Sequence, residues 1–262
     1  MLEVQGLRIA FERAGSGPPL VLLHGFVGDS REWRHQVDGL SSDYTVVAWD
    51  APGAGRSADP PASYRLPQYA DALAGLIAAL RLERPHVCGL SFGGALALEL
   101  YRRHPAIPRS LIIVAGYAGW AGSLPVDVAA ARLQRSLELL DEPAERFVTA
   151  MLPTLFSAAA APERVATFAA IMADLHPDGF RVMARSLAEA DLRDVLPIIA
   201  VPTLLVYSDG DVRAEPGIGE ALRAGIPRSR LVVLAGVGHM IDVEAPERLT
   251  AEMRGFLATV SS

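Results

Sequence analysis

A serine set between glycines is the feature of this 262-residue chain that points most directly to chemistry. Residues 88–94 read Cys-Gly-Leu-Ser-Phe-Gly-Gly and hold the pattern Gly-x-Ser-x-Gly around Ser91. An apolar run precedes this pattern, and a helical pattern rich in Ala and Leu follows it. A serine on a sharp turn from strand to helix has an exposed hydroxyl, and the free N–H groups of the helix start favour negative charge there. The pattern predicts that Ser91 is a nucleophile that attacks a carbonyl group.

A serine hydroxyl needs a general base, and His239 is the best placed of the six histidines. It lies in a glycine-rich loop, residues 236–240, after the last predicted strand and before the last predicted helix. A side chain in such a loop can reach the edge of the sheet where Ser91 is expected. By contrast, His104 ends a predicted helix and His86 begins a buried strand. We therefore predict that His239 is the base.

The base in turn needs a carboxylate that orients it, and the loop at residues 208–213 offers two. Asp209 and Asp211 both follow the apolar run at residues 203–207. The chain order serine, acid, histidine suits either of them. Asp209 also suits the role of a turn former, which is common for Asp in loops. The pattern of residues alone leaves both aspartates open.

Apolar runs alternate with helical patterns through most of the chain, as expected for a mostly parallel sheet with helices on both faces. The strand at residues 7–13 alternates apolar and polar residues, as an exposed antiparallel strand does. The other expected strands are at residues 20–23, 44–49, 87–90, 110–114, 203–207 and 231–234. Helices are expected at residues 30–40, 66–82, 92–104, 220–224 and 246–259.

The middle of the chain breaks this alternation. Residues 117–196 show helical segments without a convincing strand, opened by glycines and Pro125 and closed by Pro197. We interpret this stretch as a helical cap inserted over the carboxyl ends of the strands. Residues 1–116 and 197–262 then form a single core.

Composition narrows the classes of partner. The net charge is −6 and the arginines are scattered, so nucleic acid and anionic membrane surfaces are poor partners. Apolar stretches are broken well short of a membrane span, and the N-terminus lacks a signal peptide pattern, so a cytoplasmic location is expected. The single cysteine, Cys88, excludes an internal disulfide. We expect no metal and no cofactor, because the histidines lie far apart and no cofactor fingerprint occurs.

Several motifs in a fixed order resemble the α/β-hydrolase superfamily along essentially the whole chain, and most of all its small bacterial esterases and lactonases with a helical lid. The motifs are His24-Gly25-Phe26, the Asp-Ala-Pro-Gly-Ala-Gly-Arg-Ser run at residues 50–57, the serine turn, the Asp211 loop and Gly236-Val237-Gly238-His239. The resemblance implies an α/β fold with a mostly parallel eight-stranded sheet, flanked by helices and carrying an inserted cap.

The same resemblance assigns further roles. The family's acid loop usually reads Gly-x-x-Asp, and residues 208–211 fit this frame with Ser208 in the glycine position, which selects Asp211 as the acid. The backbone N–H groups of Phe26 and Phe92 would form the oxyanion hole. His24 resembles a structural residue beneath the loop rather than a second base.

Residues near these motifs are expected to line an apolar substrate pocket. They are His24, Gly25, Tyr117, Trp120 and Met240, with the rings of Phe26 and Phe92 beside them.

The expected function is hydrolysis of a small carboxylic ester or lactone through an acyl-serine intermediate. Ser91 argues against the dehalogenases and epoxide hydrolases of this superfamily, which use an aspartate at this turn. A carbon–carbon bond hydrolase for ring-cleavage dienones uses the same three catalytic groups and stays an alternative. A small-molecule receptor that keeps these groups is a second alternative.

Overall fold

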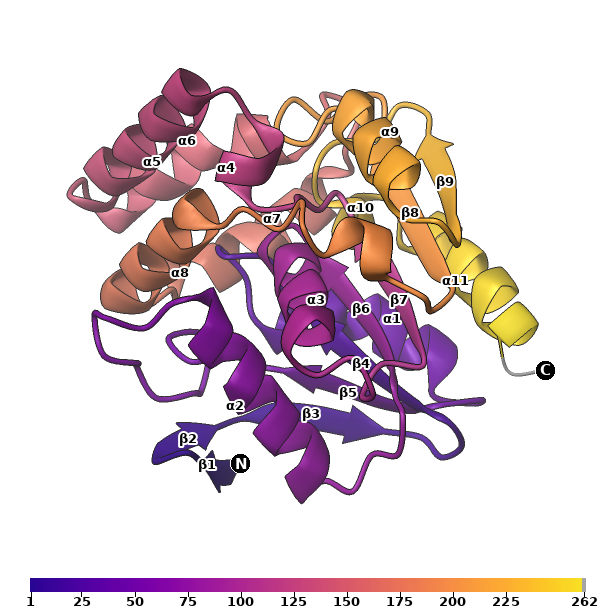
Figure 1. The fold of residues 1–262 in the computed structure, drawn as a ribbon. Coiled ribbons are helices and arrows are strands. Elements are labelled where there is room, and N and C mark those ends of the chain that lie inside the picture. The colour runs from indigo at the N-terminus through magenta and orange to yellow at the C-terminus, as the bar shows by residue number, and fades with distance from the viewer. Residues whose placement is uncertain (261–262) are drawn as a thin grey trace.

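A seven-stranded sheet forms the centre of the protein (Figure 1). Its strands are β3 (Phe11–Ala14), β4 (Pro19–Leu23), β5 (Thr45–Trp49), β6 (His86–Leu90), β7 (Ser110–Val114), β8 (Thr203–Ser208) and β9 (Ser229–Leu234). The computed structural model describes residues 1–260, so the last two residues of the expected core segment 197–262 lie outside it. The spatial order is β3-β5-β4-β6-β7-β8-β9, and only β3 is antiparallel to its neighbour.

Two expectations about the N-terminal region are wrong. The sheet has seven strands rather than eight, and residues 7–13 form two strands rather than one. β1 (Leu2–Val4) and β2 (Leu7–Ile9) pair only with each other. The break falls at Ala10, whose backbone N–H donates to Ser57 Oγ at 2.8 Å instead of to a neighbouring strand. The chain changes direction there and enters the main sheet only at β3.

The central strands are buried on both faces because helices cover both (Figure 1). Every residue of β5, β6, β7 and β8 is buried, which explains their continuous apolar runs. The longer helices of the core are α1 (Arg34–Leu40), preceded by the 3₁₀ turn η1 (Ser30–Trp33), and α2 (Leu66–Ala79), α3 (Phe92–Arg103), α9 (Pro216–Gly225) and α11 (Pro246–Val260). Helices α2 and α3 pack together on one face of the sheet, and α1 and α11 on the other.

Between β7 and β8 the chain forms helices only, as far as its described residues show. These helices are α4 (Trp120–Ser123), α5 (Val126–Leu140), α6 (Ala144–Leu155), α7 (Pro162–Ala173), α8 (Pro177–Glu189) and the 3₁₀ turn η2 (Leu196–Ile198). They contact loops at the carboxyl ends of the strands. The ring of Phe180 in α8 lies 5.0 Å from that of Phe26 after β4, and the Leu155 carbonyl of α6 accepts from the Met240 N–H after β9.

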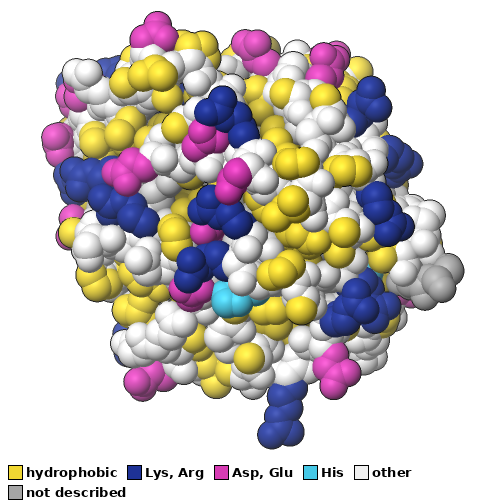
Figure 2. Space-filling view, viewed as in Figure 1, with side chains coloured by type: hydrophobic (Ala, Val, Ile, Leu, Met, Phe, Trp, Pro, Cys, Tyr) yellow, Lys and Arg dark blue, Asp and Glu magenta, His cyan; other side chains and the backbone are white. Residues whose placement is uncertain are grey.

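The molecular surface mixes charges of both signs. Acidic and basic side chains are interspersed on the face that Figure 2 shows, with apolar side chains between them. Many of these charges form exposed ion pairs, such as Arg34 with Asp38 at 2.9 Å within α1. Exposed pairs of this kind contribute about 0–1 kcal/mol each to stability.

A buried aspartate, Asp50, holds together the loops that follow β4 and β5. Its carboxylate accepts from the backbone N–H groups of Ser30 at 2.9 Å and Arg56 at 3.1 Å, and from Arg56 Nε at 3.0 Å. Burial by itself raises the pKa of Asp50, but hydrogen bonds from Ser30 and from the Arg56 backbone N–H hold the pKa below its ordinary value. The loop carrying Phe26 is therefore tied to the run at residues 50–57.

We predict that Asp50→Ala lowers the free energy of unfolding by roughly 2–4 kcal/mol, because a buried N–H, a part-buried N–H and a guanidinium lose their acceptor. Urea denaturation followed by circular dichroism measures this change. Asp38→Ala is the matched control and is expected to cost at most about 0.5 kcal/mol. Equal midpoints for the two variants would contradict the anchoring role of Asp50.

Candidate functional site

The turn at Ser91 joins β6 to α3 through a strained backbone. Ser91 has φ 52° and ψ −107°, a positive φ that is rare for residues other than glycine. Its N–H donates to the Val114 carbonyl at the end of β7, at 2.9 Å. A Cβ on Gly93 would lie 2.1 Å from the Leu23 carbonyl oxygen, and a Cβ on Gly89 2.1 Å from that of Gly93. The glycines of the motif are therefore required by close backbone approach on both sides of the serine.

The loop after β4 lies beside this turn. A Cβ built on Gly25 would be 3.9 Å from Ser91 Cβ. The backbone N–H groups of Phe26 and Phe92 have no hydrogen-bond acceptor among residues 1–260, whereas that of Gly25 donates to Glu32 Oε1 at 3.0 Å. Two free donors therefore belong to the two segments that meet at Ser91.

His239 and Asp211 lie together at the same edge of the sheet. His239 Nδ1 is 2.7 Å from Asp211 Oδ2, and both side chains are buried. The other carboxylate oxygen, Oδ1, accepts from the N–H groups of Arg213 at 2.7 Å and Ala214 at 3.0 Å. Burial alone would raise the pKa of Asp211, but its interaction with His239 and the two backbone donors lower it. The carboxylate is thus ionised and fixed against the imidazole.

The two aspartates of this loop have different partners. Asp209 Oδ1 accepts from the Gly236 N–H at 2.6 Å and so fixes the turn after β9, while Asp211 faces His239. Because β6, β8 and β9 are parallel within one sheet, the loops that carry Ser91, Asp211 and His239 leave from the same edge. Neither Ser91 Oγ nor His239 Nε2 has a hydrogen-bond partner in the described chain, so both are available to a ligand.

Aromatic residues expected at the pocket gather around Phe26. The Trp120 ring packs edge-on against Phe26 at a centroid distance of 6.1 Å. Tyr117 accepts a hydrogen bond at its hydroxyl from Arg132 at 3.0 Å. Met240 is buried directly after His239 in the loop that contacts α6. Arg132 also lies over the Trp120 ring, so Phe26, Trp120 and Tyr117 belong to one connected group. Met240 is next to the proposed base in sequence.

His24 has both ring nitrogens occupied. Nε2 accepts from the Ala51 N–H at 2.9 Å, so the proton sits on Nδ1, which donates to the Gly25 carbonyl at 2.6 Å. Burial lowers the pKa of His24, with partial opposition from Gly25 and nearby carboxylates. This histidine links the loops after β4 and β5, and both of its ring nitrogens are used in doing so.

The sequence model of the alpha/beta hydrolase fold family matches residues 18–246. The chain belongs to the α/β-hydrolase family. A thermophilic esterase from Thermogutta terrifontis, solved with malate bound, is 30% identical and superposes with a TM-score of 0.90 over 98% of this chain and 95% of its own. The enol-lactonase from Burkholderia xenovorans LB400 is 25% identical, with a TM-score of 0.89 over 98% and 99% of the two chains.

A sequence relative carries a different name. The "Putative carbamate hydrolase RutD" of Pseudomonas syringae pv. syringae is 30% identical over 92% of this hydrolase and 94% of its own length. Within residues 1–260, no helix is long and apolar enough to cross a membrane, and no group of three or more His, Cys, Asp and Glu side chains could hold a metal ion.

Sequence reasoning missed two buried carboxyl groups beneath the hydrolase's loops. Glu32 in η1 and Asp242 in α10 (Ile241–Glu244) are both nearly inaccessible to solvent. Burial raises the pKa of Asp242 to about 7, and burial together with the negative charge of Asp242 raises that of Glu32. Glu32 supports the Gly25 loop, and Asp242 lies three residues after His239. Local sequence does not mark either residue as buried, because Glu32 stands between Arg31 and Trp33 and Asp242 lies in the short run Ile-Asp-Val-Glu.

We predict that Asp242→Asn makes the hydrolase less sensitive to rising pH. The folded-state pKa of Asp242 is above the ordinary value of about 4 for an unfolded chain, so the native protein binds the proton more tightly. Tighter proton binding by Asp242 therefore stabilises the native protein fully below about pH 4, and this stabilisation is lost as the pH rises to about 7. An amide does not titrate, so the Tm of the variant relative to wild type should rise by roughly 5–10 °C between pH 4 and 8.

Thermal unfolding at several pH values measures this difference. Asp38→Asn, at an exposed site on α1, is the control and should run parallel to wild type. Parallel curves for Asp242→Asn and wild type would contradict the assignment of a buried, proton-binding carboxyl group.

Proposed function

We propose that the chain is a serine hydrolase that cleaves a small carboxylic ester or lactone through an acyl-serine intermediate. The observation that carries the proposal is the buried His239–Asp211 pair, 2.7 Å apart, at the sheet edge where the strained Ser91 turn begins α3. A neutral imidazole oriented by a carboxylate is the base that a serine nucleophile requires. The free N–H groups of Phe26 and Phe92 support the same mechanism.

In the acylation half, His239 Nε2 takes the hydroxyl proton as Ser91 Oγ attacks the substrate carbonyl carbon. The carbonyl oxygen becomes an oxyanion, which the N–H groups of Phe26 and Phe92 stabilise. The bond from carbon to the leaving oxygen then breaks, and His239 gives its proton to that oxygen. An ester releases an alcohol, while a lactone keeps its alcohol on the acyl group.

In the deacylation half, water replaces the alcohol. His239 removes a proton from the water as its oxygen attacks the acyl carbon, and the second oxyanion forms in the same place. Its collapse breaks the bond to Ser91 Oγ, which regains a proton from His239. Asp211 holds the imidazole in the tautomer with the proton on Nδ1 and stabilises the imidazolium in both halves.

The named relatives support a carbonyl that carries a heteroatom leaving group. Esterase, enol-lactonase and carbamate hydrolase all describe such substrates. Residues 117–196 act in this proposal as a cap over the site, and 1–116 with 197–262 as the catalytic core. The contacts of Trp120 and Phe180 with Phe26 support the cap, because they bring its helices onto the loop beside Ser91.

Catalysis is tested with a chain-length series of p-nitrophenyl esters. Ser91→Ala and His239→Ala should lose on the order of 10⁶-fold in kcat, and Asp211→Asn on the order of 10⁴-fold, because its amide favours the wrong imidazole tautomer. Asp209→Asn is the matched control from the same loop and should stay within about threefold of wild type, since only a turn hydrogen bond changes. Turnover by Ser91→Ala at the wild-type rate, or a larger loss in Asp209→Asn than in Asp211→Asn, would contradict the proposal.

A further inference from the structure

Two arginines beside the proposed site lack an acidic partner. Arg132 of α5 and Arg213, in the loop after β8, are half-buried, and neither has a carboxylate oxygen within 4.0 Å in the described chain. Four other half-buried arginines belong to the cap or contact it. Arg65, Arg164 and Arg181 each have a carboxylate partner at 2.7–2.9 Å, whereas Arg185 of α8 has none in the described chain.

The neutral contacts of the pair fix both guanidinium groups. Arg132 donates from one nitrogen to the Tyr117 hydroxyl at 3.0 Å and to the Arg213 carbonyl at 3.1 Å, and its guanidinium carbon lies 5.5 Å from the Trp120 ring centroid. Arg213 donates to Thr154 Oγ1 at 3.0 Å. Each guanidinium keeps further N–H donors that no described residue accepts.

The pair lies close to the proposed catalytic groups. The Arg213 guanidinium carbon is 5.6 Å from the ring centroid of Phe26, in the loop that lies beside Ser91. Arg213 also follows Asp211 by two residues, and its backbone N–H binds that carboxylate. The carboxylate of Asp211 is already held by His239 and two backbone donors, so it leaves the guanidinium groups unpaired.

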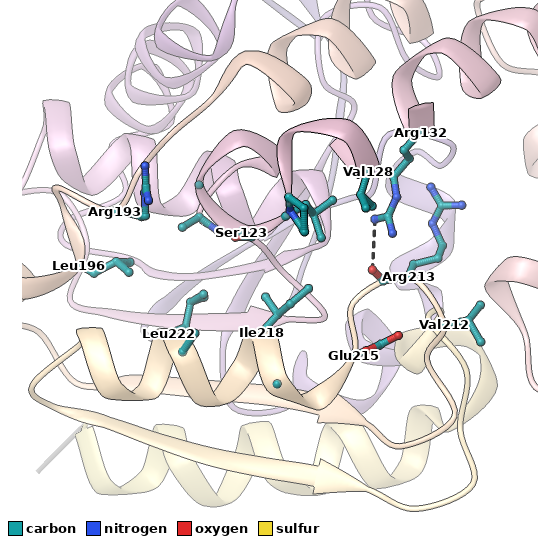
Figure 3. Close-up of a pocket in the computed structure, with 16 residues that line it drawn as sticks. Ser123, Val128, Arg132, Arg193, Leu196, Val212, Arg213, Glu215, Ile218 and Leu222 are labelled. Carbon is teal, nitrogen blue, oxygen red and sulfur yellow. Dashed lines mark hydrogen bonds between the residues drawn. The ribbon is translucent and has the colours of Figure 1, made fainter. Parts of the chain in front are cut away.

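A cavity of about 560 Å³ opens at the pair, between the start of the cap and α9 (Figure 3). Arg132 and Arg213 lie at one end of it, with the exposed Glu215 near them but in no ion pair with either, and Arg193 and Leu196 lie at the other end. Its walls are mostly apolar and include Val128, Ile218 and Leu222, which the close-up labels. The cavity has room for an aliphatic chain. Its end at Arg132 and Arg213 is the one nearest Phe26 and Asp211, which do not themselves line the cavity.

Two like charges in a half-buried place are unfavourable without an anion. Removal from water lowers the pKa of Arg213. Tyr117 opposes this shift, the positive charge of Arg132 adds to it, and Asp211 opposes it more weakly. A bound carboxylate would pair with both guanidinium groups, and planar guanidinium groups suit carboxylate oxygens well.

Building on the proposed hydrolysis, we propose that Arg132 and Arg213 bind an ionised carboxylate on the substrate, so that the enzyme prefers esters or lactones of dicarboxylic acids. The reacting carbonyl and the steps at Ser91 stay as described. The carboxylate is a second, unreacting group of the same molecule, held at the charged end of the cavity.

The test compares mono-p-nitrophenyl adipate with p-nitrophenyl hexanoate, whose acyl chains are equal in length and differ by a terminal carboxylate. The measured quantity is the ratio of kcat/KM for the adipate ester to that for the hexanoate ester. We expect a ratio above one for wild type, lowered by about tenfold to a hundredfold in Arg213→Gln and in Arg132→Gln, as for loss of a charge-assisted hydrogen bond. Arg213→Lys keeps the charge and should lose less.

Arg109→Gln is the matched control. Arg109 is also half-buried and has no carboxylate partner in the part of the chain that is described, but it precedes β7 at the opposite edge of the sheet. Its ratio should equal that of wild type. The ratio cancels any general loss of folded enzyme or of catalytic power. If Arg213 had a purely structural role beside Asp211, the ratio for Arg213→Gln would therefore equal that of wild type.

A wild-type ratio below one, or ratios in both Gln variants equal to wild type, would overturn the inference. This failure is distinct from failure of the proposed function. If Ser91→Ala abolishes hydrolysis of the hexanoate ester while the ratio does not respond to the arginines, only the anionic specificity is wrong. If Ser91→Ala hydrolyses the hexanoate ester as wild type does, the serine mechanism itself is wrong.

Discussion

The close backbone packing around Ser91 is the constraint on which the rest of the structure depends. The turn needs a positive φ at the serine and no side chain at Gly89 or Gly93, where a Cβ would meet a carbonyl oxygen at 2.1 Å. This packing fixes where α3 starts relative to β6 and to the neighbouring end of β4. A parallel sheet then brings the loops after β8 and β9 to the same edge, which is where a base and its carboxylate are useful.

The charged groups near the carboxyl ends of the strands fall into three kinds of environment. The Asp211 carboxylate is fully bonded by His239 and two backbone donors and stays ionised. Burial favours the neutral form of Asp242 instead. Arg132 and Arg213 have only neutral protein partners. The first arrangement suits catalysis, the second makes stability depend on pH, and the third leaves a positive charge for which a substrate can supply the partner.

Sequence predicted what local patterns determine. Apolar runs and helical periodicity located the parallel strands, and glycine spacing located the Ser91 turn between β6 and α3. Contacts between distant residues were not accessible in this way. The break at Ala10 depends on Ser57, 47 residues away, and residue patterns alone left Asp209 and Asp211 equivalent until their partners were seen. Arg132 and Arg213 were not singled out among the scattered arginines, because sequence does not show which arginines lack a carboxylate.

The central claim is that Ser91 is the nucleophile activated by His239. Labelling with a fluorophosphonate, followed by intact-mass and peptide mass spectrometry, tests it most directly, because the reagent phosphonylates an activated serine and loses fluoride. The account predicts one adduct per chain, located on Ser91, and at least about 10³-fold slower labelling in His239→Ala, where the base is lost. An unlabelled wild-type protein, or an adduct on a different residue, would contradict it.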